Sequence, residues 1–222
     1  MIASVAITQA EESMVGLGPK LVAAGYEVEH IPLIEIEVDA PEPLKSEIAT
    51  LDKGEYQSAT VTSGYGVRYL ASTGLGFDNV EFLAVGESTA DKLTSAGFKV
   101  GLVAPGRNAA SLAETIPPVG EHQNLLMIEG NYGNQTLHDA LTAKGYEVDT
   151  VSVYQNSDLE LTQVQLGDLS ENDVIFLASS SAAKSLARYG TDFKVAVLSE
   201  VTGATASECG FELVELSVDL GG

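Results

Sequence analysis

The stretch IEGNYGNQTLHDALTAKGYEVDTVSVYQN, residues 128–156, holds a pattern that occurs twice in the chain. It runs from an apolar strand through a polar loop and a helix-period segment to Gly-Tyr-Glu-Val, and then into a second apolar strand. Residues 6–36, AITQAEESMVGLGPKLVAAGYEVEHIPLIEI, follow the same order, with the tetrapeptide at 25–28 as at 145–148. This spacing is too long for a solenoid repeat, so it indicates duplication of a large α/β half.

Two further pairs of segments repeat in the same order. VTSGYGVRYL (61–70) and LASSSAAKSL (177–186) each end an apolar strand in a small-residue turn that opens a helix. Residues 82–100 and 195–214 each contain a strand, a polar turn, an Ala-rich helix, Gly-Phe and a strand. This alternation is typical of parallel sheets with helices on their faces. The predicted fold class is therefore α/β, with two similar lobes that each contain a parallel sheet flanked by helices.

The position of one proline- and glutamate-rich run favours interleaved domains. EIEVDAPEPLKSE (35–47) follows the first copy of the opening unit directly, and its prolines oppose both helix and central strand. VYQNSD is its counterpart after the second copy. A two-strand crossing between lobes, with a hinge and a cleft beside it, is the expected arrangement. The predicted lobes are residues 1–36 plus 156–222 and residues 37–155, with hinge strands at about 32–37 and 151–156.

The composition excludes several classes of partner. The chain carries 32 acidic residues against 11 basic ones, which gives a formal net charge of −21. Such a surface repels phosphate backbones and anionic membranes, so we expect neither nucleic acid nor membrane as a partner. No apolar run reaches the roughly 18 residues of a spanning helix, and the first residues do not resemble a signal peptide. We expect a cytoplasmic protein.

Familiar catalytic and metal-binding motifs do not occur in the sequence. The Rossmann, P-loop, zincin, nucleophile-elbow and Cys-x-x-Cys patterns all fail to match. His30, His122 and His138 are widely separated, whereas the ligands of a structural metal site usually come in close pairs. The single cysteine, Cys209, has no histidine near it in sequence and is expected to be structural. We therefore expect no metal.

Small polar turns follow the predicted strands and open the predicted helices. They lie at residues 8–12, 62–66, 86–90, 105–109, 130–135, 179–182 and 199–203. The carboxyl ends of parallel strands share one edge of a sheet, where open α/β folds bind ligands. Helix N-termini there present N–H groups that suit carboxylates or phosphates. Helix capping explains the Ser, Thr and Asn residues of these turns as well, because capping and anion binding use the same amides.

The order of these segments resembles the uroporphyrinogen-III synthase family. The resemblance spans nearly the whole chain, although each motif is loose. Its carriers are PLIEI (32–36), TSGYGVRYL (62–70), AVGESTADKLTSAGF (84–98), the block from Gly130 to Gln155, SSSAAKSL (179–186) and VTGATASECGF (201–211). The two-lobed, doubly crossed fold of this family agrees with the interleaved arrangement expected above.

The resemblance implies a function. Hydroxymethylbilane would be cyclised, with loss of water and inversion of its last pyrrole ring, to uroporphyrinogen III for haem, sirohaem and related pigments. It implies a cyclising hydro-lyase that needs no cofactor and takes a small-molecule substrate. A monomer is expected, with the enzyme of the preceding step as a further partner. A non-catalytic bilobal binding protein for a small polyanion or a tetrapyrrole is the alternative.

The resemblance also implies site residues. Tyr154 corresponds to the tyrosine of the family's Val-Tyr-Gln segment, which is proposed to help the substrate hydroxyl leave. A half-buried aromatic on a crossing strand is the alternative role of Tyr154. The matching substrate-binding positions are Thr62, Ser63, Gly64, Gly86, Ser88, Thr89, Gly130, Asn131, Ser179, Ser180, Ser181 and Thr202.

The sequence departs from the family at basic positions. The first strand ends in Thr8-Gln9-Ala10 rather than Thr-Arg-Pro, and Glu129 stands where the family has an arginine before glycine. Backbone amides would therefore have to hold most of a substrate that carries eight carboxylates. Arg68, Arg107 and Lys184 are hypothesised to add positive charge at the mouth of the cleft, and a solvated surface position explains each of them at least as well.

Overall fold

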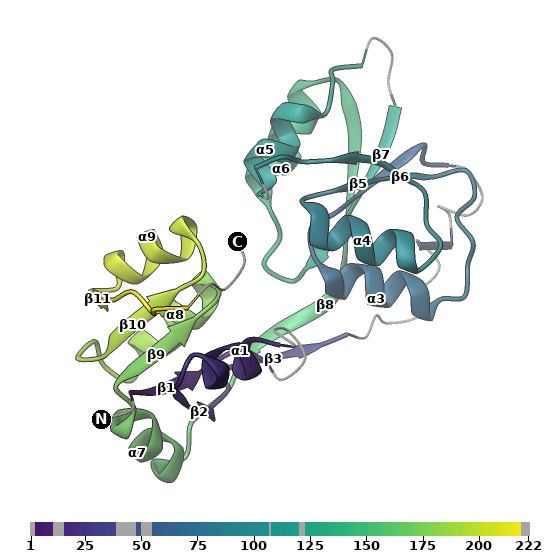
Figure 1. Cartoon of the computed structure of the whole chain (residues 1–222). Coiled ribbons are helices and arrows are strands. Elements are labelled where there is room, and N and C mark those ends of the chain that lie inside the picture. The colour runs from purple at the N-terminus through teal and green to yellow at the C-terminus, as the bar shows by residue number, and fades with distance from the viewer. Residues whose placement is uncertain are drawn as a thin grey trace. The chain divides into compact units, whose positions relative to one another are not determined.

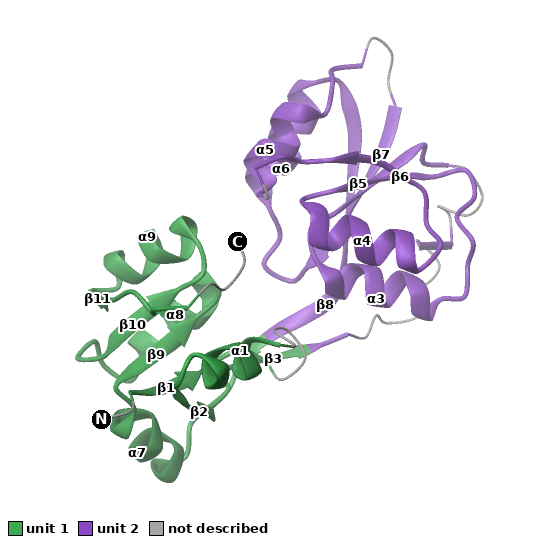
Figure 2. Ribbon diagram, viewed as in Figure 1, with its two compact units in different colours: residues 1–36, 157–222 green, residues 37–156 purple. Residues whose placement is uncertain are grey.

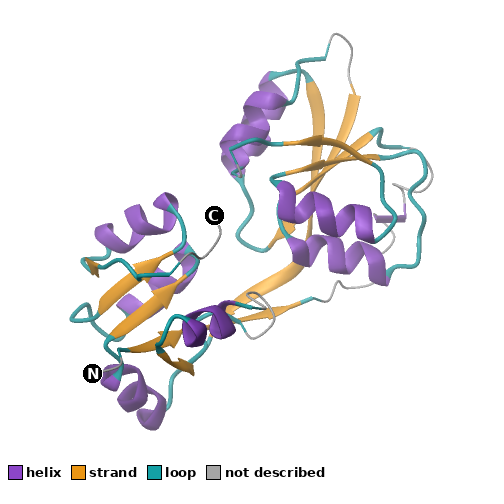
Figure 3. Cartoon of the chain, in the orientation of Figure 1, coloured by secondary structure: helices purple, strands orange, loops and turns teal. Residues whose placement is uncertain are grey.

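The computed structural model describes residues 3–10, 16–38, 48–49, 55–106, 108–119 and 123–218. Strands and helices alternate along most of the chain, as Figure 3 shows. The strands are β1 (Ser4–Ile7), β2 (Glu27–His30), β3 (Ile34–Glu37), β4 (Ser58–Val61), β5 (Glu81–Ala84), β6 (Val100–Val103), β7 (Gln123–Gly130), β8 (Tyr146–Asp158), β9 (Val174–Leu177), β10 (Lys194–Val197) and β11 (Glu212–Leu213). The helices are α1 (Leu17–Ala23), α3 (Gly64–Ser72), α4 (Glu87–Ser95), α5 (Ala109–Thr115), α6 (Gln135–Ala143), α7 (Gln163–Glu171), α8 (Ser180–Ala187) and α9 (Glu200–Glu208).

These elements divide into two compact units (Figure 2). Unit 1 comprises Met1–Ile36 and Ser157–Gly222, and unit 2 comprises Glu37–Asn156. The chain therefore passes between the units twice, once within β3 and once within β8, because each of these strands contains a unit boundary. The division of the protein into two domains with these ranges stays a prediction. The hinge at residues 32–37 and 151–156 also stays a prediction.

Unit 1 contains a five-stranded sheet in the order β11-β10-β9-β1-β2, and all its neighbouring strands pair in parallel. Helices α7, α8 and α9 pack on one face through side chains such as Leu169, Leu186 and Ala206. On the opposite face, Leu17 and Leu21 of α1 pack against Phe176 (Figure 1). Alternate residues of each strand therefore enter two separate cores.

Unit 2 contains most of a six-stranded sheet in the order β3-β8-β7-β4-β5-β6. The pairs β7–β8, β4–β7, β4–β5 and β5–β6 are parallel. Helices α5 and α6 cover the face that carries Leu125 and Met127. Helix α3 covers the other face so closely that a Cβ atom on Gly66 would lie 3.1 Å from Val61 Cγ1. The predicted fold class, α/β with parallel sheets flanked by helices, is confirmed.

Side-chain oxygens cap most of the described helices, and all of these caps except Thr162 lie in polar turns that the sequence analysis identified. Each cap accepts a hydrogen bond from a backbone N–H in the first helical turn, which would otherwise have no intrahelical acceptor. The capping residues are Ser63, Asn108, Asn134, Thr162, Ser179 and Ser199. Helix α4 differs, because its N-cap is Gly86 and no side chain caps it.

The C-terminus of α5 depends on a lysine from the next helical segment. Lys144 Nζ donates hydrogen bonds to the backbone carbonyls of Ala113, Glu114 and Ile116, with the first at 2.5 Å and the second at 3.1 Å. The last carbonyls of a helix have no intrahelical donor, so one ammonium group satisfies several of them. This contact fixes α5 to α6 on one face of unit 2.

Substitution of Lys144 by methionine is expected to lower the free energy of unfolding by about 1.5–3 kcal/mol, the contribution of a hydrogen bond to a charged group. Methionine keeps the apolar stem and removes only the ammonium. Lys99→Met is the matched control, because the Lys99–Glu81 pair has side chains that are 65% and 50% exposed. An exposed pair contributes less than about 1 kcal/mol. Urea denaturation measures both variants, and equal losses would contradict the capping role of Lys144.

Candidate functional site

Parallel strands of unit 2 end at one edge of its sheet, and the predicted site residues of this unit gather there. These residues follow β4, follow β5, or lie at the end of β7. They are Thr62, Ser63, Gly64, Gly86, Ser88, Thr89, Gly130 and Asn131. Tyr154 joins them from β8, where it is in register with Gly130. This is the edge at which open α/β sheets bind ligands.

Tyr154 packs closely against the main chain of β7. A Cβ atom on Gly130 would lie 2.7 Å from Tyr154 Cζ and 2.9 Å from Cδ2, so only glycine fits beneath the ring. The Tyr154 side chain is nearly buried, with 9% of the residue exposed. Its hydroxyl makes no hydrogen bond to another described residue. The structure thus places Tyr154 at the sheet edge with its ring held against the main chain of β7.

The first turns of α3 and α4 differ in capping, and therefore in how many backbone N–H groups a ligand could bind. In α3, Ser63 Oγ accepts from the Tyr65 N–H at 3.1 Å. In α4, Gly86 has no side chain to cap the helix, so the first amides at Glu87 and Ser88 are uncapped. Thr89 is buried, and its N–H donates to Gly86 O at 3.1 Å. Uncapped amides at a helix N-terminus attract anions.

Asn131 is engaged in holding strands together. Its backbone N–H donates to Tyr154 O at 3.1 Å, and its side-chain Nδ2 donates to Asn156 O at 3.1 Å. Its Oδ1 accepts from the Asn156 N–H at 2.9 Å. These bonds tie the turn after β7 to β8. A direct role in substrate binding stays a prediction for Asn131.

Lys92 is a cation of this edge that the sequence analysis did not single out. A Cβ atom on Gly64 would lie 2.9 Å from Lys92 Cδ and closer still to Nζ, so the ammonium of this α4 residue lies over the first residue of α3. An ammonium beside the positive end of a helix dipole is an arrangement that favours a bound anion between them. The signal in the sequence was weak, because Lys92 lies in the last turn of α4 rather than in a turn motif.

Glu129 is a buried acid next to Gly130. It is 5% exposed, and its Oε2 has no hydrogen-bond partner within the described residues. Burial raises the pKa of its carboxyl above the usual value, while a hydrogen bond from the Asn134 backbone and the charge of His138 oppose this rise. A buried acid therefore lies directly before Gly130, next to the N-terminus of α6.

The predicted site residues of unit 1 lie at the carboxyl ends of β9 and β10. Ser179 caps α8 through the Ala182 N–H at 3.2 Å, and its Oγ lies 3.0 Å from Ser181 Oγ. Ser180 Oγ is 2.8 Å from Thr205 Oγ1 on α9. Thr202 is buried, and its Oγ1 lies 3.0 Å from Oγ of Ser199, the cap of its own helix. The structure therefore brings Ser179, Ser180, Ser181 and Thr202 to neighbouring strand ends, where each takes part in capping or helix contact.

A pocket of about 810 Å³ adjoins the turn that follows β10. Its walls are the end of β10, the first turn of α9 and the segment that follows β11. Ser199 and Gly203 supply polar and small surface, while Leu198, Val214 and Leu216 supply apolar surface. It is therefore a mostly apolar hollow beside an N-terminal helix turn.

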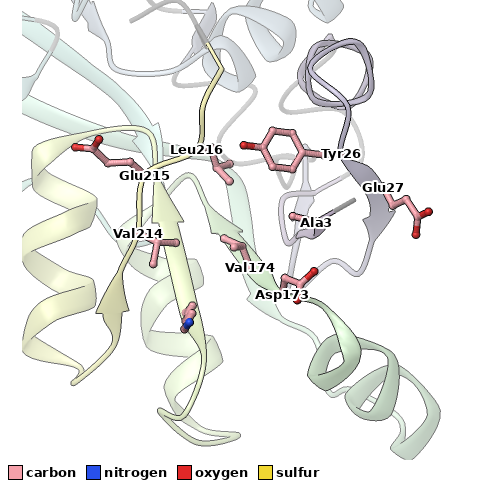
Figure 4. Close-up of a pocket in the computed structure, with 9 residues that line it drawn as sticks. Ala3, Tyr26, Glu27, Asp173, Val174, Val214, Glu215 and Leu216 are labelled. Atoms are coloured by element: carbon pink, nitrogen blue, oxygen red, sulfur yellow. The ribbon is translucent and has the colours of Figure 1, made fainter. Parts of the chain in front are cut away.

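A second pocket in unit 1, of about 630 Å³, lies at the opposite edge of the same sheet. Figure 4 shows Glu27, Asp173 and Glu215 around it, together with Tyr26 and Leu216. These three carboxylates outnumber the one ammonium of the lining, that of Lys194, and oppose the binding of an anion. This pocket therefore does not belong to the predicted site.

Of the three basic residues hypothesised to add charge at the cleft mouth, the structure describes Arg68 and Lys184. Arg68 is exposed in the middle of α3, and Lys184 is exposed in the last turn of α8, away from the capped end of that helix. Arg107 lies outside the described residues. Their contribution of local charge stays a prediction.

The described part of the chain contains neither a metal-binding cluster nor a membrane-spanning helix. No group of three or more His, Cys, Asp or Glu side chains there is placed to hold a metal ion. His30 Nε2 lies 2.6 Å from Gln9 O, His138 Nδ1 lies 3.5 Å from Asp139 Oδ1, and His122 lies outside the described ranges. None of the described helices combines the length and hydropathy that crossing a bilayer requires.

Comparison with known proteins agrees with this geometry. The family model described as uroporphyrinogen-III synthase HemD matches residues 16–217. The chain belongs to the uroporphyrinogen-III synthase family. No curated protein sequence gives a significant match to it.

Solved structures of uroporphyrinogen III synthases share the fold. A mutant enzyme from the extremely thermophilic bacterium Thermus thermophilus is 20% identical, with a TM-score of 0.70 over 98% of this chain and 94% of that one. The wild-type enzyme of that bacterium in another crystal form is 19% identical, with a TM-score of 0.56 over 95% and 90%. The enzyme from Helicobacter pylori is 18% identical, with a TM-score of 0.63 over 96% and 92%.

Replacement of Glu129 by glutamine is expected to change the pH dependence of stability. Burial raises the carboxyl pKa in the folded state, so the stability associated with the bound proton is present at low pH and lost as pH rises through the folded pKa. Glutamine cannot ionise and still accepts a hydrogen bond. The variant should therefore melt at a higher temperature than the wild type at about pH 7.5, with a difference that shrinks below the unfolded pKa of about 4.3.

Thermal unfolding followed from about pH 4 to pH 8 measures this difference across the range in which a glutamate titrates. Glu114→Gln in the exposed part of α5 is the matched control and should give no such trend. A melting difference that is the same at every pH would refute the assignment of a buried, raised-pKa carboxyl to Glu129.

Proposed function

We propose that this chain converts hydroxymethylbilane to uroporphyrinogen III, as a cyclising hydro-lyase. The observation that carries the proposal is the family match over residues 16–217. Loss of the terminal hydroxyl as water gives an azafulvene on the first ring. The last ring attacks it through its substituted carbon, and the resulting spiro intermediate fragments and recloses with that ring inverted.

In this mechanism Tyr154 donates the proton that turns the departing hydroxyl into water. A phenol hydroxyl within hydrogen-bond reach of the leaving oxygen can act as a general acid. Its position at the sheet edge, with the ring packed over Gly130, supports this role. The pyrrole nitrogens supply the electrons, so the remaining task of the protein is to orient a flexible chain and exclude water.

Backbone amides bind the substrate carboxylates in this proposal, with help from Lys92. The uncapped first turn of α4 and the first turn of α3 supply N–H groups, and the Lys92 ammonium lies beside the latter. Hydrogen bonds to a charged group contribute about 1.5–3 kcal/mol each. Several of them outweigh the repulsion from a chain of net charge −21, since salt screens distant charges beyond roughly 8 Å.

The two units correspond to the proposed lobes, residues 1–36 plus 156–222 and residues 37–155, with the crossing strands as a hinge. Thr202 and the Ser179–Ser181 turn would contact the substrate from the first lobe. We further propose that the protein acts in the cytoplasm as a monomer and receives its unstable substrate from the enzyme of the preceding step.

The direct test is incubation of the protein with freshly generated hydroxymethylbilane, followed by oxidation and separation of the porphyrin isomers. Type III product above the spontaneous background supports the proposed function. Only the type I isomer, which forms without catalysis, would overturn it in favour of a binding protein.

Replacement of Tyr154 by phenylalanine is expected to lower kcat for type III formation by about 10²–10⁴-fold, the usual contribution of a general acid. Phenylalanine keeps the ring over Gly130 and removes only the hydroxyl, so the fold and the Michaelis constant should change little. Initial rates and the melting temperature measure these effects. Unchanged turnover would limit Tyr154 to a packing role.

Replacement of Lys92 by methionine is expected to raise KM by about 5–20-fold, with little change in kcat, since one hydrogen bond from a charged donor is lost in both substrate and transition state. Lys194→Met is the matched control, because Lys194 is exposed at the first residue of β10, at the amino end of the strands of the other sheet. Steady-state kinetics at low ionic strength compare the two. An equal effect of both substitutions would mean that net charge, and not the position of Lys92, determines affinity.

A further inference from the structure

Tyr154 has an aromatic neighbour that the reaction proposed above does not use. The ring of Tyr65, in the first turn of α3, lies with its centroid 5.6 Å from that of Tyr154 and with the ring planes tilted by 40°. Tilted and edge-to-face arrangements at this separation are the favourable geometries of aromatic pairs. Tyr65 and Tyr154 are called the tyrosine pair below.

The tyrosine pair is completed by the main chain of β7. Tyr154 rests against Gly130, where any Cβ atom would overlap the ring, and its backbone carbonyl accepts from the Asn131 N–H at 3.1 Å. The ring of Tyr154 therefore has the Gly130 backbone and the ring of Tyr65 as neighbours. Rotation away from this position requires the loss of both contacts.

Tyr65 is itself held in place by its own helix. Its backbone N–H donates to Ser63 Oγ at 3.1 Å, and the residue is half-buried. The capping bond fixes the first turn of α3, and with it the Cα position of Tyr65. Ser63, Gly130 and Asn131, which the sequence analysis assigned to substrate binding, thus all bear on the placement of the tyrosine pair.

We propose that Tyr65 is a positioning residue that holds the ring of Tyr154 in the orientation that delivers its hydroxyl to the leaving group. This inference rests on the proposed function for its catalytic part, while the ring contact itself can be tested without turnover. A weak acid acts only within hydrogen-bond reach of the atom that it protonates. A ring that is free to rotate spends less time there, so kcat falls while substrate affinity stays unchanged.

Kinetics of Tyr65→Leu test the catalytic part. The expected result is a fall in kcat of about tenfold, which corresponds to the upper end of the interaction free energies of aromatic pairs. The value of KM should stay within about twofold of that of the wild type. Tyr65→Phe keeps the ring and should restore kcat to within about threefold of the wild type. A Tyr65→Phe variant that is as slow as Tyr65→Leu would overturn the proposal, since the hydroxyl of Tyr65 and not its ring would then be required.

A double-mutant cycle distinguishes action through Tyr154 from direct action on the substrate. In a Tyr154→Phe background, Tyr65→Leu should have no further effect on kcat, because the acid that it positions is already gone. Additive losses would overturn the proposal and make Tyr65 an independent contact. If Tyr154→Phe alone leaves turnover intact, the acid of the proposed function fails, and that result is separate from the ring-contact measurement below.

Nuclear magnetic resonance of ring-labelled tyrosine tests the contact without activity. Tyr65→Leu should shift the Tyr154 ring resonances and accelerate its ring flips, and Gly130→Ala should do the same by displacing the ring from the other side. Gly130→Ala also serves if Tyr65→Leu does not fold. Tyr154 resonances that are unchanged in a folded Tyr65→Leu protein would overturn the inference.

Phe98→Leu provides the matched control. Phe98 is also in unit 2, and its ring lies 5.3 Å and 5.7 Å from the rings of Phe82 and Phe77. It precedes β6 and therefore lies at the other end of the parallel strands from Tyr154. The same aromatic-to-leucine change there should lower the melting temperature and leave both kcat and the Tyr154 resonances unchanged. A fall in kcat as large as that of Tyr65→Leu would mean that general loosening of unit 2, and not the tyrosine pair, explains the effect.

Discussion

The parallel pairing of β7 with β8 is the constraint on which the candidate site depends. Its register shifts between Glu129 and Gly130, and the shift places Tyr154 opposite Gly130, which has no side chain. An aromatic ring can lie directly on the backbone only at a glycine. The same pairing lets Asn131 bond to both Tyr154 and Asn156, so the end of β7 and the crossing strand β8 are held as one rigid element.

The parallel α/β architecture also gives this acidic chain a way to bind an anion. A strongly acidic chain cannot attract a polyanion at long range, so affinity has to come from short-range donors. Parallel strands followed by helices supply such donors without basic side chains, because each helix N-terminus carries unsatisfied N–H groups. Lys92 adds one ammonium beside the first turn of α3, so the ammonium and the helix N-terminus both favour an anion at this point.

Glu129 places a buried carboxyl next to the N-terminus of α6. An acid at this end of a helix interacts favourably with the dipole, which offsets part of the cost of burial.

The sequence by itself determined the order of strands and helices, the parallel α/β class and the polar turns, because period, glycine position and capping residues are local signals. The resemblance to a family likewise followed from motif order, and it predicted a catalytic role for Tyr154. Only the tertiary structure showed that Lys92 reaches Gly64, that Tyr65 packs on Tyr154, and that Asn131 is engaged by β8. These contacts join residues far apart in sequence, and strand register and helix packing, which no local pattern encodes, decide which of them meet.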